Sequence, residues 1–152
     1  MDRNSRPLEV IKEDVFNSIN IRVESPDGTM FITVLENEGN LPFKILVHIG
    51  KAGTSLSAWA DALAEFVSEA LPRIGVNSVI AMLLNIRSDR VAFIKDTWTR
   101  GDDGVIVVRS GPEAIAYALI KYRTEKHRDF MKGLGIREDD DLEDYFRPAN
   151  SA

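Results

Sequence analysis

Residues 45–71 constrain the fold most, because they join a strand pattern directly to a helix pattern. Apolar residues alternate up to Ile49, which is typical of a strand with one buried face. After residues 50–55 they recur at helical spacing and predict an amphipathic helix. The expected stripe is Leu56, Ala60, Leu63, Val67 and Ala70, widened by Trp59 and Phe66. Pro72 is expected to end this helix at Leu71, with residues 72–75 as a turn.

The loop between these two patterns is a candidate anion site. Gly53 permits a backbone angle that other residues avoid, and Thr54 or Ser55 is a suitable helix N-cap. Unpaired amides at a helix start attract phosphate or carboxylate, and Lys51 adds positive charge. The candidate ligand-binding residues are therefore Gly50, Lys51, Ala52, Gly53, Thr54 and Ser55.

Other interpretations of the loop stay open. The glycines also fit a strand-to-helix connection that serves only the turn. Residues 50–53 resemble the GxxG loop of KH domains, but KH loops join two helices and bind nucleic acid, whereas here a strand precedes the loop in an acidic chain. A Walker A loop is excluded by the spacing of the glycines and the lysine.

Composition narrows the class of protein. The chain has 152 residues, which suits one domain, and its net charge of -5 argues against general nucleic-acid binding. It has no cysteine, so disulfides, thiolate metal sites and cysteine nucleophiles are excluded. No segment reads as a signal peptide or a membrane span, so a cytoplasmic protein without membrane contact is expected. No metal or cofactor is predicted.

The first half of the chain predicts a β-meander. Residues 19–24, 29–36 and 43–49 alternate as strands, separated by turns at residues 25–28 and 37–42. We therefore expect an α+β fold in which a three-stranded antiparallel meander packs against two or three helices. The predicted organisation is a loose lead over residues 1–14, a single domain over 15–135 and an acidic tail over 136–152.

The second half predicts two further helices. Asn77 or Ser78 is expected to cap one of them, with a stripe of Val79, Met82, Leu83 and Ile86 that ends at residues 87–90. Residues 91–100 are ambiguous, 101–104 read as a turn, and 105–108 as a short strand or a lead into a helix. Residues 110–113 fit a capping box. The last helix carries the stripe Ala114, Ile115, Ala118, Leu119 and Tyr122, and ends at Gly133 and Gly135.

The acidic tail completes the chain. It reads as a solvated segment or a short helical hook, and Leu142, Tyr145 and Phe146 would allow it to dock on a partner. Catalysis by this chain is not indicated, because neither His48 nor His127 has a nucleophile at recognisable spacing, and no catalytic residue is predicted.

Two separated stretches resemble one family. Residues 50–57 and 61–63 resemble the helix start at the C-terminal end of adenosylcobalamin-dependent ribonucleotide reductases, and residues 72–76 and 84–87 resemble the turn and the segment after that helix. Residues 108–119, VRSGPEAIAYAL, are similar to the signature that names the TSCPD domain. The matches occur in the expected order across residues 29–121.

The departures from the family pattern qualify this resemblance. Gly111 stands where the family has its signature cysteine, Glu113 replaces an aspartate, and Ser88 stands where members often carry another cysteine. The chain also contains no reductase barrel, glycyl radical site or cobalamin segment. The resemblance therefore implies a stand-alone accessory domain that contacts a ribonucleotide reductase, another protein or a nucleotide.

The sequence supports two function hypotheses from different classes. The first is a non-catalytic accessory domain of the TSCPD type, for which self-association into a homo-oligomer is also expected. The second is an independent module that binds a nucleotide, phosphate or other small anion through the Gly50 loop, with Arg109 and Ser110 added to the site if the motifs meet in space. Arg87 and Arg90 could join Arg109 and Lys51 in one basic patch. An enzyme whose residues escape recognition remains a third option.

Overall fold

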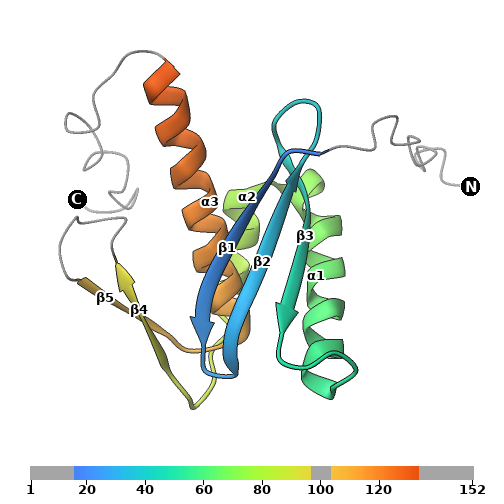
Figure 1. The fold of residues 1–152 in the computed structure, drawn as a ribbon, viewed down its shortest axis with the longest axis vertical. Helices are drawn as coiled ribbons and strands as arrows, with labels where there is room; N and C mark the ends of the chain where they lie inside the picture. Colours follow the sequence, from blue (N-terminus) through green and yellow to red (C-terminus); the bar gives the residue numbers. More distant parts are fainter. Residues whose placement is uncertain (1–15, 97–103, 134–152) are drawn as a thin grey trace, which may run out of the picture.

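The computed structural model describes residues 16–96 and 104–133, and the fold within them is α+β, as predicted. The element order is β1 (Ser18–Ser25), β2 (Gly28–Glu36), β3 (Pro42–Ile49), α1 (Ser55–Ile74), α2 (Val76–Leu83), β4 (Ala92–Asp96), β5 (Gly104–Val108) and α3 (Gly111–Gly133) (Figure 1). The predicted lead, acidic tail and most of the turn at 101–104 lie outside the described residues.

The three predicted strands form the expected antiparallel meander in the order β1-β2-β3. Their alternation sets the register, because Ile21 pairs with Ile32 and Ile32 with Val47, so one row of apolar side chains faces the same way. The tight turn between β1 and β2 is held by Ser25, whose hydroxyl donates to the Gly28 carbonyl at 2.7 Å. The apolar face of the sheet must then be covered by helices.

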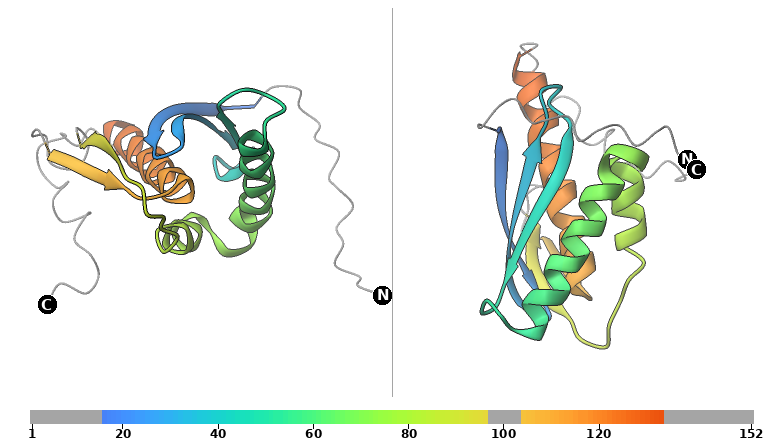
Figure 2. Two further views of the ribbon diagram at one scale, coloured as in Figure 1. Left: turned by 90° about the horizontal axis from the view of Figure 1, so that it is seen from below. Right: turned by 90° about the vertical axis from the view of Figure 1, so that its right-hand side faces the viewer.

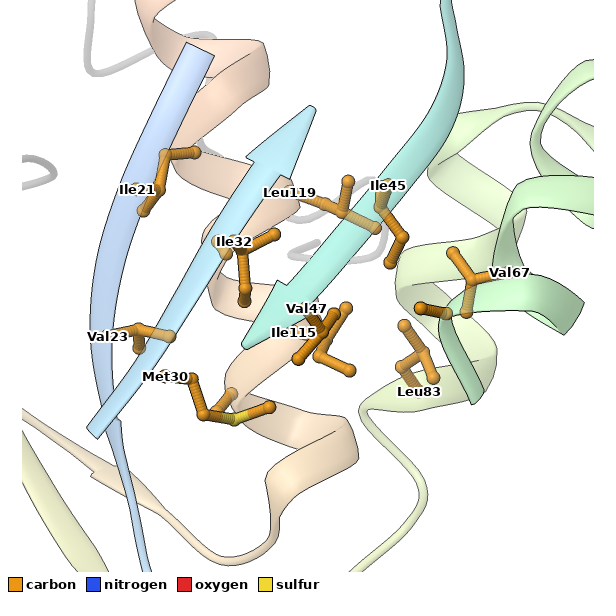
Figure 3. Packing of buried hydrophobic residues seen from close by; sticks show 14 of the residues in the cluster. Ile21, Val23, Met30, Ile32, Ile45, Val47, Val67, Leu83, Ile115 and Leu119 are labelled. Carbon is orange, nitrogen blue, oxygen red and sulfur yellow. The ribbon is translucent and has the colours of Figure 1, made fainter. Parts of the chain in front are cut away.

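The three helices lie on the same side of this sheet (Figure 2). α3 packs against β1 and β2, α1 packs against β3, and α2 lies against α3 and α1. Ile115 and Leu119 of α3 are fully buried and project between the strands and the other two helices (Figure 3). The predicted stripe of α3 is therefore confirmed, and α3 is the helix around which the core is built.

α1 also closes the free edge of β3. The hydroxyl of Ser68 accepts from the Ile45 N–H at 3.0 Å and donates to the Ala64 carbonyl of its own helix at 2.7 Å. Since β3 is a terminal strand of its sheet, the Ile45 N–H would otherwise lack a strand partner.

The prediction that α1 ends at Leu71 is wrong. The helix continues through Pro72 to Ile74 and ends at Gly75, whose N–H donates to the Leu71 carbonyl at 3.0 Å. In the last turn a proline removes only one helical hydrogen bond, so the helix tolerates it. Gly75 then reverses the chain with φ 83° and ψ 160° and leads directly into α2.

The predicted outline of α2 is also wrong in part. It begins at Val76 with no side-chain cap and ends at Leu83, and its buried residues are Val79, Ile80 and Leu83. Met82 is 62% exposed and Ile86 lies beyond the helix. Asn77 instead accepts from the Arg123 guanidinium at 2.7 Å, which ties α2 to α3.

Two aromatic residues of α1 face away from the core. The buried side of this helix is Ala60, Ala64, Val67 and Leu71. Trp59 and Phe66, which were predicted to widen the buried stripe, are 75% and 73% exposed. Small side chains allow α1 to approach the sheet closely, and the two bulky rings are left on the solvent side.

The ambiguous segment contains a strand. β4 pairs antiparallel with β5 in a separate two-stranded ribbon, which confirms the strand reading of residues 105–108. The ribbon stands beside β1 and the first half of α3 (Figure 1).

An ion pair with a buried carboxylate links β2 to α3. The Lys126 ammonium lies 2.8 Å from the Glu36 carboxylate, whose side chain is 2% exposed. Tyr122 packs beside them and is itself buried. Burial, followed by the charge and hydrogen bonding of Glu36, raises the pKa of the Tyr122 phenol well above its usual value.

Candidate functional site

The loop from Gly50 to Ser55 has the local structure predicted for it. Gly50 and Gly53 both adopt positive φ, at 63° and 82°, as the chain leaves β3 and enters α1. Thr54 is the N-cap, because its hydroxyl accepts from the Ser57 N–H at 3.2 Å and donates to the Lys51 carbonyl at 2.8 Å. Lys51, Ala52 and Ser55 are exposed, so the loop is open to solvent.

The start of α1 carries no negative charge of its own. Its first turn contains no acidic residue, unlike the first turn of α3. In the described ranges, Lys51 forms no ion pair. The positive end of the helix and this ammonium are therefore both uncompensated locally.

Arg109 and Ser110 lie at the start of α3, in a different setting. Ser110 is buried, and its hydroxyl accepts from the Glu113 N–H at 3.0 Å and donates to the Ile86 carbonyl. The Arg109 N–H donates to the Glu113 carboxylate at 2.6 Å. The predicted capping box is present with one difference, because Glu113 reaches the residue before the cap rather than the cap itself.

A second carboxylate stands near this helix start. A Cβ added to Gly111 would lie 3.7 Å from an Asp27 carboxylate oxygen, which comes from the turn between β1 and β2. The chain's own Asp27 and Glu113 thus compensate the positive end of α3. No hydrogen bond or ion pair among the described residues joins the Gly50 loop to Arg109 or Ser110, although both lie at the same end of the molecule (Figure 1).

Ser88, from the segment between α2 and β4, is hydrogen-bonded to the backbone just before α3. Its N–H and its hydroxyl both donate to the Arg109 carbonyl, at 2.8 and 2.7 Å, and its oxygen accepts from the Arg90 N–H at 3.2 Å. The resemblance expects cysteines near Ser88 and at Gly111, and the structure shows that these two segments are neighbours. From the sequence they are two independent replacements. The fact that both cysteines are replaced in the same chain is the signal that could have predicted the contact.

Three arginines lie near the hydrogen bonds between Ser88 and Arg109. Arg87 and Arg109 both act on the Tyr117 phenol, although burial and then Glu113 outweigh them and raise its pKa. Arg90 lies two residues after Ser88. Arg87, Arg90 and Arg109 thus lie near the start of α3, and in the described ranges Lys51 makes no hydrogen bond or ion pair with them.

Metal sites and membrane spans are both absent from the described residues. Over residues 16–96 and 104–133, no three His, Cys, Asp or Glu side chains are placed to hold a metal ion. In the same ranges, no helix has the length and apolar character needed to cross a membrane.

Comparison with known proteins gives one match. The family model described as the TSCPD domain matches residues 8–123, which include both sheets, α1, α2 and the first half of α3. No curated protein and no solved structure matches the chain.

Proposed function

The protein belongs to the TSCPD domain family, since the family model matches residues 8–123 of 152, and from this premise we propose that it is a non-catalytic accessory domain that binds a ribonucleotide reductase. The reductase is proposed as the partner because residues 50–57 resemble the C-terminal end of the adenosylcobalamin-dependent enzymes.

The observation that carries this proposal is the pair of aromatic rings on the outer side of α1. Trp59 and Phe66 are the two most exposed large apolar side chains in the described part of the chain. They are seven residues apart, so they lie on one face of the helix. Each ring can bury about 150–250 Å² against a partner, and tryptophan is enriched among residues that dominate binding energy. The opposite face of α1 packs against β3.

A binding measurement tests this role. Purified adenosylcobalamin-dependent reductase from the source organism should bind the chain in calorimetry, and a Trp59→Ser, Phe66→Ser protein should bind at least about tenfold more weakly, which is a loss of about 1.4 kcal/mol. The matched control is Phe31→Ser, which removes a ring that is 52% exposed on the outer face of the sheet. The proposal fails if the unaltered chain does not bind, or if the control weakens binding equally.

The open start of α1 favours a second candidate function, the binding of a nucleotide or another small anion. The Gly50 loop presents an uncompensated helix end and Lys51, and Trp59 lies one turn further on, where its ring could stack on a nucleobase. A ligand at about 100 times its Kd should stabilise the fold by about 2.7 kcal/mol.

Thermal unfolding with a panel of nucleotides and inorganic phosphate tests this candidate. Lys51→Ala should abolish the ligand-induced shift, while Lys95→Ala, an exposed lysine on β4, should preserve it. No shift with any ligand, or an equal shift in the Lys51→Ala protein, would rule the loop out as the site.

A further inference from the structure

The β4–β5 ribbon has one face that no described element covers. Its register pairs Phe93 with Val107 and Lys95 with Val105, and places Val91 opposite Arg109 at the next position. Because side chains alternate along a strand, these six residues point to one side, while Ala92, Ile94, Ile106 and Val108 point to the body of the protein. The outer ribbon face thus comprises Val91, Phe93, Lys95, Val105, Val107 and Arg109, all of them exposed.

This face is apolar in its centre and positive at its ends. Phe93 and Val105 are 62% and 60% exposed, with Lys95 at one end and Arg109 at the other. Arg87 and Arg90 lie beside Arg109. In the described ranges, none of these cations forms an ion pair. A partner for this face needs carboxylates together with apolar side chains.

The chain itself contains a segment of that chemistry. Its composition is acidic overall, but six of its 24 acidic residues are concentrated in positions 138–144: Glu138, Asp139, Asp140, Asp141, Glu143 and Asp144. Leu142 lies among them, and Tyr145 and Phe146 come directly after. The segment thus combines negative charge with a leucine and two aromatic rings.

We propose that residues 138–146 bind the outer ribbon face of the same molecule. The carboxylates pair with Lys95 and Arg109, and the apolar side chains cover Phe93, Val105 and Val107. Exposed ion pairs contribute little individually, so the apolar cover is needed to hold the segment. The ribbon packs only its inner face against β1 and α3, so a segment that covers its outer face would stabilise it further.

The segment is long enough to reach. α3 runs from Gly111 to Gly133, a rise of about 33 Å, and the ribbon stands beside its first half (Figure 1). An extended chain from Gly133 spans at most about 27 Å to Asp141 and about 44 Å to Phe146. Glu143 and Asp144, which full extension places about 34 and 37 Å from Gly133, can therefore run back along α3 as far as its start beside Arg109.

Paramagnetic relaxation measured by NMR on the full chain tests this contact. The chain has no cysteine, so a nitroxide on Val107→Cys labels one site. The amide signals of residues 138–146 should lose at least half of their intensity. A label on Leu46→Cys, which is 49% exposed on the outer face of β3, should leave them unchanged. Salt at about 1 M, where the screening length is about 3 Å, should restore the signals.

Charge reversal supplies the independent check. Lys95→Glu with Arg109→Glu should restore the signals, and adding Asp141→Lys, Glu143→Lys and Asp144→Lys to that protein should reduce them again. A label on Val105→Cys must reproduce the Val107→Cys result, which guards against a local disturbance by either label. Equal loss with the Leu46→Cys label overturns the proposal, as does loss that appears only between molecules in a mixture of labelled and unlabelled chains.

Discussion

At the scale of single residues, Gly75 decides where the long helical region bends. With φ 83° and ψ 160° it occupies a backbone region that is essentially reserved for glycine. Gly75→Ala should therefore lower the free energy of unfolding by about 1–3 kcal/mol.

Gly111 provides the matched control, because its φ is not positive and an added Cβ meets only Asp27 at 3.7 Å. Gly111→Ala should leave stability unchanged or raise it by up to about 1 kcal/mol. Urea unfolding of both proteins measures the difference. Equal destabilisation by the two substitutions would show that backbone strain at Gly75 is not the cause.

Residue patterns predicted the strand faces correctly but misjudged α1. Alternation places Ile45, Val47 and Ile49 inside because a strand has only two faces. A helix rich in apolar residues has several possible stripes, and hydrophobicity alone ranks Trp59 above Ala64. The face with the small residues packs against the sheet instead. Which face does so depends on the separation between α1 and the sheet, and a local sequence pattern does not contain that separation.

At the scale of elements, the two long helices begin with caps of different importance. Ser110 caps α3 while buried and also donates to the Ile86 carbonyl, whereas Thr54 caps α1 in an exposed loop. Ser110→Ala should cost about 2 kcal/mol and Thr54→Ala about 1 kcal/mol of unfolding free energy. Chemical denaturation of both proteins measures this, and a larger loss for Thr54→Ala would contradict the structural role assigned to Ser110.

Most elements could be predicted from the sequence, and the errors have local causes. Pro72 suggested a helix end because proline disfavours helix before it, yet at the last turn the cost is one hydrogen bond. The hydrogen bond from Ser88 to Arg109 could not be predicted, since it joins residues 21 positions apart and its acceptor is a backbone carbonyl. The elements of the candidate site were thus foreseen, but not which of them meet.

At the scale of the whole molecule, Tyr122 should make stability depend on alkaline pH. An unfolded tyrosine ionises near pH 10, and the pKa of folded Tyr122 is raised, so above about pH 10 the unfolded chain binds fewer protons than the folded one. Stability should therefore fall as the pH rises through that range, by at most about 1.4 kcal/mol per unit for this group.

Urea unfolding between neutral and strongly alkaline pH measures this dependence. Tyr122→Phe should lower stability at neutral pH but flatten the alkaline decline. Tyr117→Phe is the control, because that side chain is only half-buried and should flatten the decline less. An unchanged slope in Tyr122→Phe would assign the decline to other groups.

The bond from Ser68 to the edge of β3 has a consequence for crowded solutions. An unsatisfied terminal strand is a template on which identical chains can stack into fibrils. Here the hydroxyl of one helical serine accepts from the Ile45 N–H, a backbone group that such stacking would otherwise use on this side. Ser68→Val would keep a side chain of similar volume but expose that template, so the altered protein should seed filaments at concentrations where the natural chain stays dispersed.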